Sequence, residues 1–219
     1  MSEQTRGQTQ ERTLMKKFGI PMIAGAVAGF IASFAIVTVM NRGAFGDLDA
    51  SREVAMLVAV LYVITGASVL IGAFSPALGS RFLNVEDADE LREQKTMLTY
   101  SAIGMFALAG ALALAALAAP VGPVPATIAV TGFAMMLLLT WFTGKRQEQH
   151  MDELMKAVSR DTAATAFYLV FLIGGTWALL GHVGWTAAPK ALDWLTMFVV
   201  LMLVASFWAA GKRGMLNRR

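Results

Sequence analysis

The 219-residue chain contains no cysteine and only two histidines. Without cysteine it cannot carry out thiol catalysis or hold a zinc–thiolate site, an iron–sulfur cluster or a disulfide scaffold. Charge is also scarce, since 15% of the residues are charged and 57% are apolar, against about 25% and about 45–50% in an average soluble domain. This composition excludes a disordered or collagen-like chain, argues against an ordinary soluble enzyme, and is typical of a protein embedded in lipid.

Long apolar stretches make up most of the chain, and a membrane-spanning helix needs about 20 such residues. The longest stretch, 96–144, exceeds one crossing and is divided by the prolines of 120–125, which a helix interior does not tolerate. Because only helices satisfy every backbone polar group inside a bilayer, we expect an all-α bundle of six helices over 16–211, between a mobile tail (1–15) and a basic tail (212–219). The predicted spans are 18–41, 54–78, 97–119, 124–143, 164–186 and 192–211.

Lysine and arginine are distributed very unevenly over the connections between these spans. Fifteen of them fall on the side that holds both termini and three on the other side. Cytoplasmic loops carry the excess of positive charge, so we expect a bacterial inner-membrane protein with both termini in the cytoplasm. The net charge of +3 then reflects topology and anionic lipid, and it does not indicate direct binding of nucleic acid.

Ionisable residues are missing from the interiors of the predicted spans. Proton-coupled transporters and pumps need such residues, whereas a passive pore or a lipid-binding cavity does not. His150 and His182 are expected on opposite sides of the membrane, so they cannot share a metal ion. No nucleotide-binding, nucleophile-elbow or zinc-protease motif occurs, and no catalytic, cofactor-binding or metal-binding residue is predicted.

Small residues repeat along the predicted span 97–119, where Ala107, Ala111, Ala115 and Ala119 are spaced four apart. Such a ridge allows helix backbones to approach closely in a membrane. Packing within one six-helix bundle is the favoured interpretation, and the contact face of a homodimer is the alternative.

The two long predicted cytoplasmic loops, 79–96 and 144–163, each contain Asp-Glu-Leu, 63 residues apart. At this offset the second and third spans overlay the fourth and fifth, which suggests a duplicated helical hairpin. The second loop has helical periodicity: Met151, Leu154, Met155 and Val158 share one face. Charged residues spaced four apart occupy the other face, and the acids precede the bases, which is the favoured order for ion pairs within a helix. These residues are Glu148, Asp152, Lys156 and Arg160.

Acidic residues concentrate in these loops, because eight of the eleven on the predicted cytoplasmic side lie in 86–93 or 148–153. One interpretation is that helical extensions of the spans are kept in water by local ion pairs. The other is a docking surface for a cytosolic protein, because charges of both signs orient a partner. The residues predicted for that surface are Asp89, Glu90, Arg92, Asp152, Glu153, Lys156 and Arg160.

The run from Asp152 to Ala163 resembles a loop of small, uncharacterised prokaryotic multi-span membrane proteins that carry Asp-Glu-Arg where the chain re-enters the membrane. This chain differs at Leu154, where those proteins have arginine. Some of them are paired with helix-turn-helix regulators, so the resemblance implies a membrane protein that docks or sequesters a small transcription regulator. The sequence thus favours a non-enzymatic regulatory or scaffolding protein. A passive transporter, a channel, a lipid-handling protein and an accessory subunit of a larger membrane complex are the alternatives.

Overall fold

The structure, a computed structural model, describes Phe34, Thr38, residues 49–75 and residues 88–213. In this part the chain forms helices and turns, with one isolated β-bridge between Ala118 and Val124. Five helical segments are long and apolar enough to cross a membrane. The all-α, multi-span expectation is confirmed to this extent. The predicted tail 1–15 lies outside the described residues, as does the predicted span 18–41 except for Phe34 and Thr38, which are helical.

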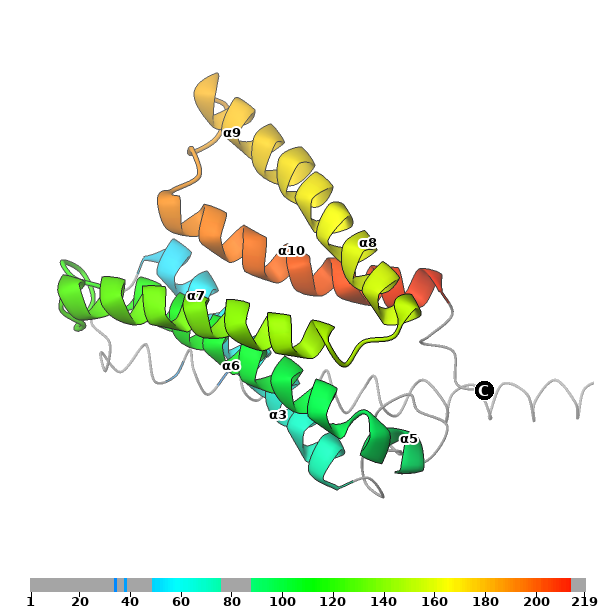
Figure 1. The fold of residues 1–219 in the computed structure, drawn as a ribbon. Helices are drawn as coiled ribbons and strands as arrows, with labels where there is room; N and C mark the ends of the chain where they lie inside the picture. The colour runs from blue at the N-terminus through cyan, green and yellow to red at the C-terminus, as the bar shows by residue number, and fades with distance from the viewer. Residues whose placement is uncertain (1–33, 35–37, 39–48, 76–87, 214–219) are drawn as a thin grey trace, which may run out of the picture.

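Figure 1 shows the helices, coloured in chain order from the N-terminus to the C-terminus. They are α3 (Ala50–Phe74), α5 (Ala88–Glu93), α6 (Lys95–Ala116), α7 (Ala126–Glu148), α8 (Glu153–Leu169), the π-helical turn η2 (Val170–Gly174), α9 (Gly175–His182) and α10 (Ala191–Lys212). The segments α8, η2 and α9 together form one helical segment of 30 residues that is long and apolar enough to cross a membrane.

Helix boundaries differ from the predicted spans where polar side chains cap the ends. The segment α3 begins four residues before the predicted 54, because the Asp49 carboxylate accepts a hydrogen bond from the backbone N–H of Arg52. The segment α8 begins eleven residues before the predicted 164, because Asp152 accepts one from the N–H of Met155. At the C-terminus, α10 extends to Lys212, the first residue of the predicted basic tail.

The predicted tight hairpin between α6 and α7 is confirmed, although α6 ends at Ala116 and not at 119. The turn is closed by hydrogen bonds from the Ala119 N–H to the Val124 carbonyl (2.7 Å) and from the Val124 N–H to the Leu117 carbonyl (3.0 Å). A Cβ atom at Gly122 would lie 2.1 Å from the Leu117 carbonyl oxygen, so this position requires glycine.

The helices pack in a definite order: α6 lies between α3 and α7, and α10 contacts both α3 and α8 (Figure 1). The core lies where α3, α6 and α10 meet, and it contains Ala55, Met56, Val58, Ala59, Tyr62, Ala109, Leu112, Ala116 and Leu203. Many of these side chains are small, which permits the close backbone approach on which helix association in lipid depends. The hydroxyl of Tyr62 donates to the Val199 carbonyl at 2.6 Å and links α3 to α10 inside this core.

The predicted alanine ridge is confirmed in part. Ala107 and Ala111 are buried at 2% exposure, whereas Ala115 is only half-buried. Ala119 lies past the end of α6, in the turn. Other alanines of α6 that are not on the ridge, such as Ala109 and Ala116, are also buried. Because α6 has a neighbour on each side, it buries two faces and not one stripe.

The two predicted hairpins differ in packing. In the first, α3 and α6 pack along each other. In the second, α7 and α8 diverge after a turn of four residues, and their neighbours are α6 and α10 respectively (Figure 1). A duplicated hairpin therefore stays a prediction from the sequence, without support from the arrangement of the helices.

Successive spans alternate in direction and give the bundle two ends (Figure 1). One end, called here the Asp49 end, contains the starts of α3, α7 and α10 and the final residues of α6 and α9. The other, called the α5 end, contains α5, the starts of α6 and α8 and the final residues of α3, α7 and α10. The predicted cytoplasmic residues that are described all belong to the α5 end.

Candidate functional site

Charged side chains at the α5 end form ion pairs close to the ends of helices. The Lys145 ammonium lies 3.1 Å from a Glu148 carboxylate oxygen at the end of α7, and Lys156 lies 3.0 Å from Glu153 at the start of α8. Arg213, which follows α10, pairs with Asp161 on α8. All three pairs are exposed to a substantial degree, so they hold charge in water while contributing little to stability.

The predicted charge row with steps of four residues is wrong in its pairing. The segment α7 ends at Glu148 and α8 begins at Glu153, so Glu148 and Asp152 do not belong to one continuous helix. Asp152 serves as the cap of α8, and Lys156 pairs with Glu153 three residues before it. The loop is nevertheless helical except for residues 149–152, as the sequence predicts.

The two Asp-Glu-Leu motifs occupy different environments. Leu91 is 1% exposed and anchors the short α5, whereas Leu154 is 51% exposed at the start of α8. The other predicted members of the Leu154 face, Met151, Met155 and Val158, are half-buried. The predicted helical face is therefore confirmed for Met155 and Val158, because Met151 precedes α8 and Leu154 is exposed.

The predicted docking residues are placed at one end of the bundle but on separate helices. Asp152, Glu153, Lys156 and Arg160 belong to the cap and the first two turns of α8, which packs against α10. Arg92 is exposed on α5, which packs against α3 and α6. Asp89 and Glu90 fall within α5, and their side chains lie outside the described part of the chain.

His150, Lys95 and Arg146 at the α5 end contact aromatic rings or helix carbonyls. The Nδ1 atom of His150 lies 2.8 Å from the Arg146 carbonyl oxygen, and the ring lies 5.9 Å from Tyr100. Lys95 lies 4.4 Å from the centroid of the Phe74 ring, and the Arg146 guanidinium lies 5.1 Å from that of Phe142. These contacts combine an apolar base with a charged tip, which suits the boundary between lipid and water.

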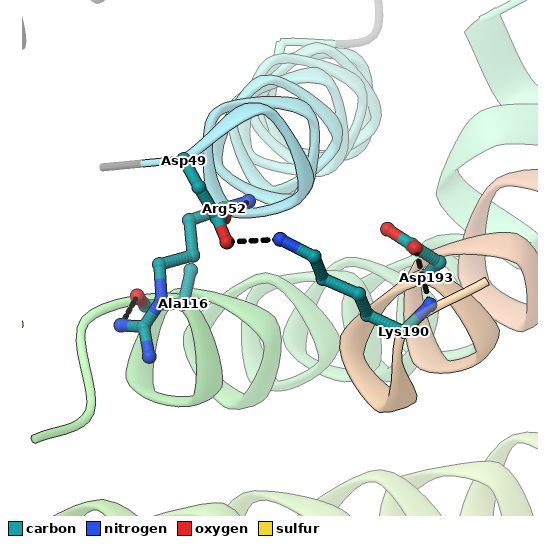
Figure 2. A network of polar contacts seen from close by, with 5 residues as sticks. All are labelled: Asp49, Arg52, Ala116, Lys190 and Asp193. Carbon is teal, nitrogen blue, oxygen red and sulfur yellow. Dashed lines mark hydrogen bonds and ion pairs between the residues drawn. The ribbon is translucent and has the colours of Figure 1, made fainter. Parts of the chain in front are cut away.

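A second polar cluster, which the sequence reasoning missed, lies at the Asp49 end (Figure 2). The Lys190 ammonium lies 2.6 Å from a carboxylate oxygen of Asp49. The guanidinium of Arg52 donates from one nitrogen to the carbonyls of Ala116 (2.6 Å) and Ala118 (2.9 Å). The carboxylate of Asp193 accepts a hydrogen bond from the Lys190 backbone N–H at 2.7 Å. This cluster joins the starts of α3 and α10 to the last residues of α6.

The electrostatics of this cluster favour the ionised form of Asp49. The hydrogen bond from Lys190 and, after it, the one from the Arg52 backbone hold the pKa of Asp49 below its ordinary value of 3.8. A signal in the sequence could have indicated part of the cluster, since Asp49 is a candidate N-cap five residues before the apolar run that begins at Val54. The pairing of Asp49 with Lys190, 141 residues later, depends on the packing of α10 against α3 and could not be read locally.

Among the described residues, no group of three or more His, Cys, Asp or Glu side chains could hold a metal ion. Comparisons with protein-family models, with curated proteins and with solved structures found no match for this chain. The α5 end and the Asp49 end are therefore judged on their geometry alone.

Proposed function

We propose that the protein is a non-enzymatic integral membrane protein of regulatory or scaffolding type, which docks a soluble protein on the charged helix ends of the α5 end. One observation carries this proposal. Exposed residues of both charge signs on α5 and on the first turns of α8 lie at the same end of the bundle (Figure 1). The distribution of lysine and arginine favours the cytoplasm for this end.

The start of α8 has properties that suit a docking surface. Its backbone is fixed by the Asp152 cap and by packing against α10. The Glu153 side chain is 86% exposed, and Leu154 next to it presents an apolar group to the same solvent. An apolar contact within a charged rim is the usual composition of a protein interface, where the rim sets orientation and association rate.

The chemistry of the surface suggests a basic partner. The segment 86–93 contributes five acids, Glu86, Asp87, Asp89, Glu90 and Glu93. A DNA-binding regulator is basic where it meets phosphate, so this segment would compete with DNA for the same surface. The resemblance of the 152–163 run points in the same direction. The partner we propose is therefore a small cytosolic transcription regulator that the membrane protein holds away from DNA.

Charge-reversal variants test the proposal. One variant carries Asp89→Lys with Glu90→Lys, and a second carries Glu153→Lys, while Asp152 is changed only to Asn so that α8 keeps its cap. The matched control is Glu53→Lys, which reverses an exposed acid at the Asp49 end. Tagged protein is purified from the native host, and soluble proteins bound to it are compared by quantitative mass spectrometry.

We expect a soluble DNA-binding protein that is recovered with the wild type and the control and depleted several-fold from both α5-end variants. Binding of the purified partner should also weaken as salt increases, because rim charges are screened. Recovery of no soluble protein, or equal recovery by all variants that insert and fold, would refute the docking function. A transporter or a complex subunit would then be the better description.

A further inference from the structure

We propose that Asp49, Arg52 and Lys190 form a latch at the Asp49 end, and that breaking its ion pair opens the seam between α3 and α10 to water while the bundle stays folded. The inference is independent of the docking function, because it concerns the opposite end of the molecule. Figure 2 shows the three side chains between the two helices and the end of α6.

The first half of the latch is the Asp49–Lys190 ion pair. Its atoms are 2.6 Å apart, and the two side chains are 45% and 61% exposed respectively. They come from the N-cap of α3 and the N-cap of α10, two helices that also contact each other along the core. Because the pair is exposed, solutes on that side of the membrane reach it directly, and dissolved salt screens the attraction between its charges.

The second half is Arg52, which ties the same turn of α3 to α6. The last carbonyls of a helix lack partners within the helix, and the Arg52 guanidinium supplies donors to those of Ala116 and Ala118. Residues 49–52 therefore hold two other helices at once: α6 through Arg52 and α10 through Asp49. Loss of the Asp49–Lys190 ion pair leaves the Arg52 hydrogen bonds intact. The ends of α3 and α10 can therefore separate while α3 stays in contact with α6.

The connection that carries Lys190 is anchored from the other side as well. The indole N–H of Trp177 on α9 donates to the Ala187 carbonyl at 2.8 Å, and Asp193 binds the Lys190 N–H. The residues between α9 and α10 are thus held to their own helices. The ion pair with Asp49 joins this unit to the start of α3, beside the apolar packing of Leu192 against the core.

The residues packed directly below the latch determine how far water would enter between α3 and α10 if the ion pair broke. Ala55 lies six residues after Asp49 on α3 and is completely buried, as is Ala116 on α6. The next polar link between α3 and α10 along α3 is the hydrogen bond from Tyr62 to the Val199 carbonyl, about three and a half helical turns from Asp49 and about two from Ala55. Opening of the latch should therefore expose Ala55 to water before it disturbs the Tyr62 contact.

Because the chain contains no cysteine, a single engineered thiol reports on this opening without background. The reporter is Ala55→Cys, and its rate of reaction with a charged maleimide is measured in detergent, where both ends are accessible regardless of topology. The latch variants are Asp49→Asn, which removes the charge but retains a capping side chain, and Lys190→Gln. The matched control is Glu53→Gln, which removes an exposed charge of α3 that is not part of the latch. Thr186→Cys, an exposed position, gives the rate of an open site.

We expect the Ala55→Cys rate to rise about two- to fivefold in both latch variants, the range that loss of an exposed ion pair allows, with the unfolding temperature nearly unchanged, and to stay at the wild-type level in the control. In the otherwise unchanged protein the rate should rise with salt, and this salt dependence should disappear in Asp49→Asn. Equal rates in folded latch variants and control would overturn the proposal. If the latch variants do not fold, a rate that is independent of salt in the unmodified latch overturns it equally.

Discussion

Single residues at the helix termini determine where the helices of this protein begin. Asp49 and Asp152 each accept a hydrogen bond from the backbone three residues later, and this placed both helix starts well before the apolar runs that indicated them. An apolar run shows which residues lie in lipid, whereas the cap shows where the helix begins in water. The helices therefore begin earlier than the predicted spans 54–78 and 164–186, and their first turns precede the apolar runs.

The capping role of Asp152 leads to a prediction that separates its structural from its electrostatic contribution. Replacing Asp152 by Ala should lower the stability of the protein by about 0.5–2 kcal/mol, because an N–H at the start of α8 loses its partner. Asp152→Asn should retain most of the stability, since the amide oxygen also accepts. Thermal unfolding in detergent measures both variants, and equal losses for Ala and Asn would show that the cap is unimportant.

Gly174 and Gly175 are neighbours with opposite expectations. A Cβ atom at Gly174 would lie 2.6 Å from the ring of Trp194 and 3.1 Å from Met197, whereas one at Gly175 would meet nothing within 4 Å. Gly174→Ala should therefore push α10 away and cost about 1–3 kcal/mol, the usual range for overpacking. Gly175→Ala should be neutral or slightly stabilising, because alanine favours the helix. Unfolding temperatures of the two variants test this contrast, and a reversed order would contradict the described contact between η2 and α10.

At the scale of the helices, α6 is central because it packs between α3 and α7. The sequence predicted the small residues of this helix but only one buried ridge. The sequence could not indicate a second buried face, because Leu and Ala side chains can face either lipid or a neighbouring helix. Periodicity therefore distinguishes buried from exposed faces less clearly in this chain than in a water-soluble one.

The two faces of α6 give a graded prediction. Ala111 is 2% exposed, whereas Ala115 is half-buried four residues later. Ala111→Leu should destabilise the protein by about 1–3 kcal/mol through overpacking, and Ala115→Leu should cost less. Thermal unfolding of both variants in the same detergent provides the comparison. A loss at Ala115 as large as that at Ala111 would show that α6 is packed more completely than the described helices account for.

At the scale of the whole molecule, the sequence predicted the class of fold and four features of its layout. These are the multi-span architecture, the tight turn at 118–125, the helical parts of 144–163 on either side of residues 149–152, and the order of the described spans. They depend on local composition and on Gly and Pro, which act at short range. The contacts that close the bundle, such as Asp49 with Lys190 and Gly174 with Trp194, join distant residues. A single sequence contains no local signal for such pairs, so they emerge only from the packing.

The helix that carries Asp152, Glu153, Lys156 and Arg160 matches its prediction in part, while docking at these residues stays a prediction. The residues of the α8 start do share two helical turns, as their spacing indicated. The ion pairs of these residues and the exposure of Leu154 differ from the prediction. The reason is that α8 begins after its cap at Asp152, so the expected row of charges does not lie on one continuous helix. The latch at the Asp49 end was missed, since the sequence analysis weighed the sparse charges of that side only as topology signals.

The central claim is that the α5 end and the Asp49 end lie on opposite sides of a membrane, with the α5 end in the cytoplasm. Single-cysteine labelling in intact cells with a membrane-impermeant maleimide tests it most directly. Val121→Cys suits the Asp49 end because Val121 is exposed, whereas Gly122 cannot accept a side chain. Gln149→Cys suits the α5 end because Gln149 is exposed in the turn between α7 and α8. We expect labelling of Val121→Cys in intact cells and of Gln149→Cys only after permeabilisation. Labelling of both from the same side, or in the reverse order, would show that this topology is wrong.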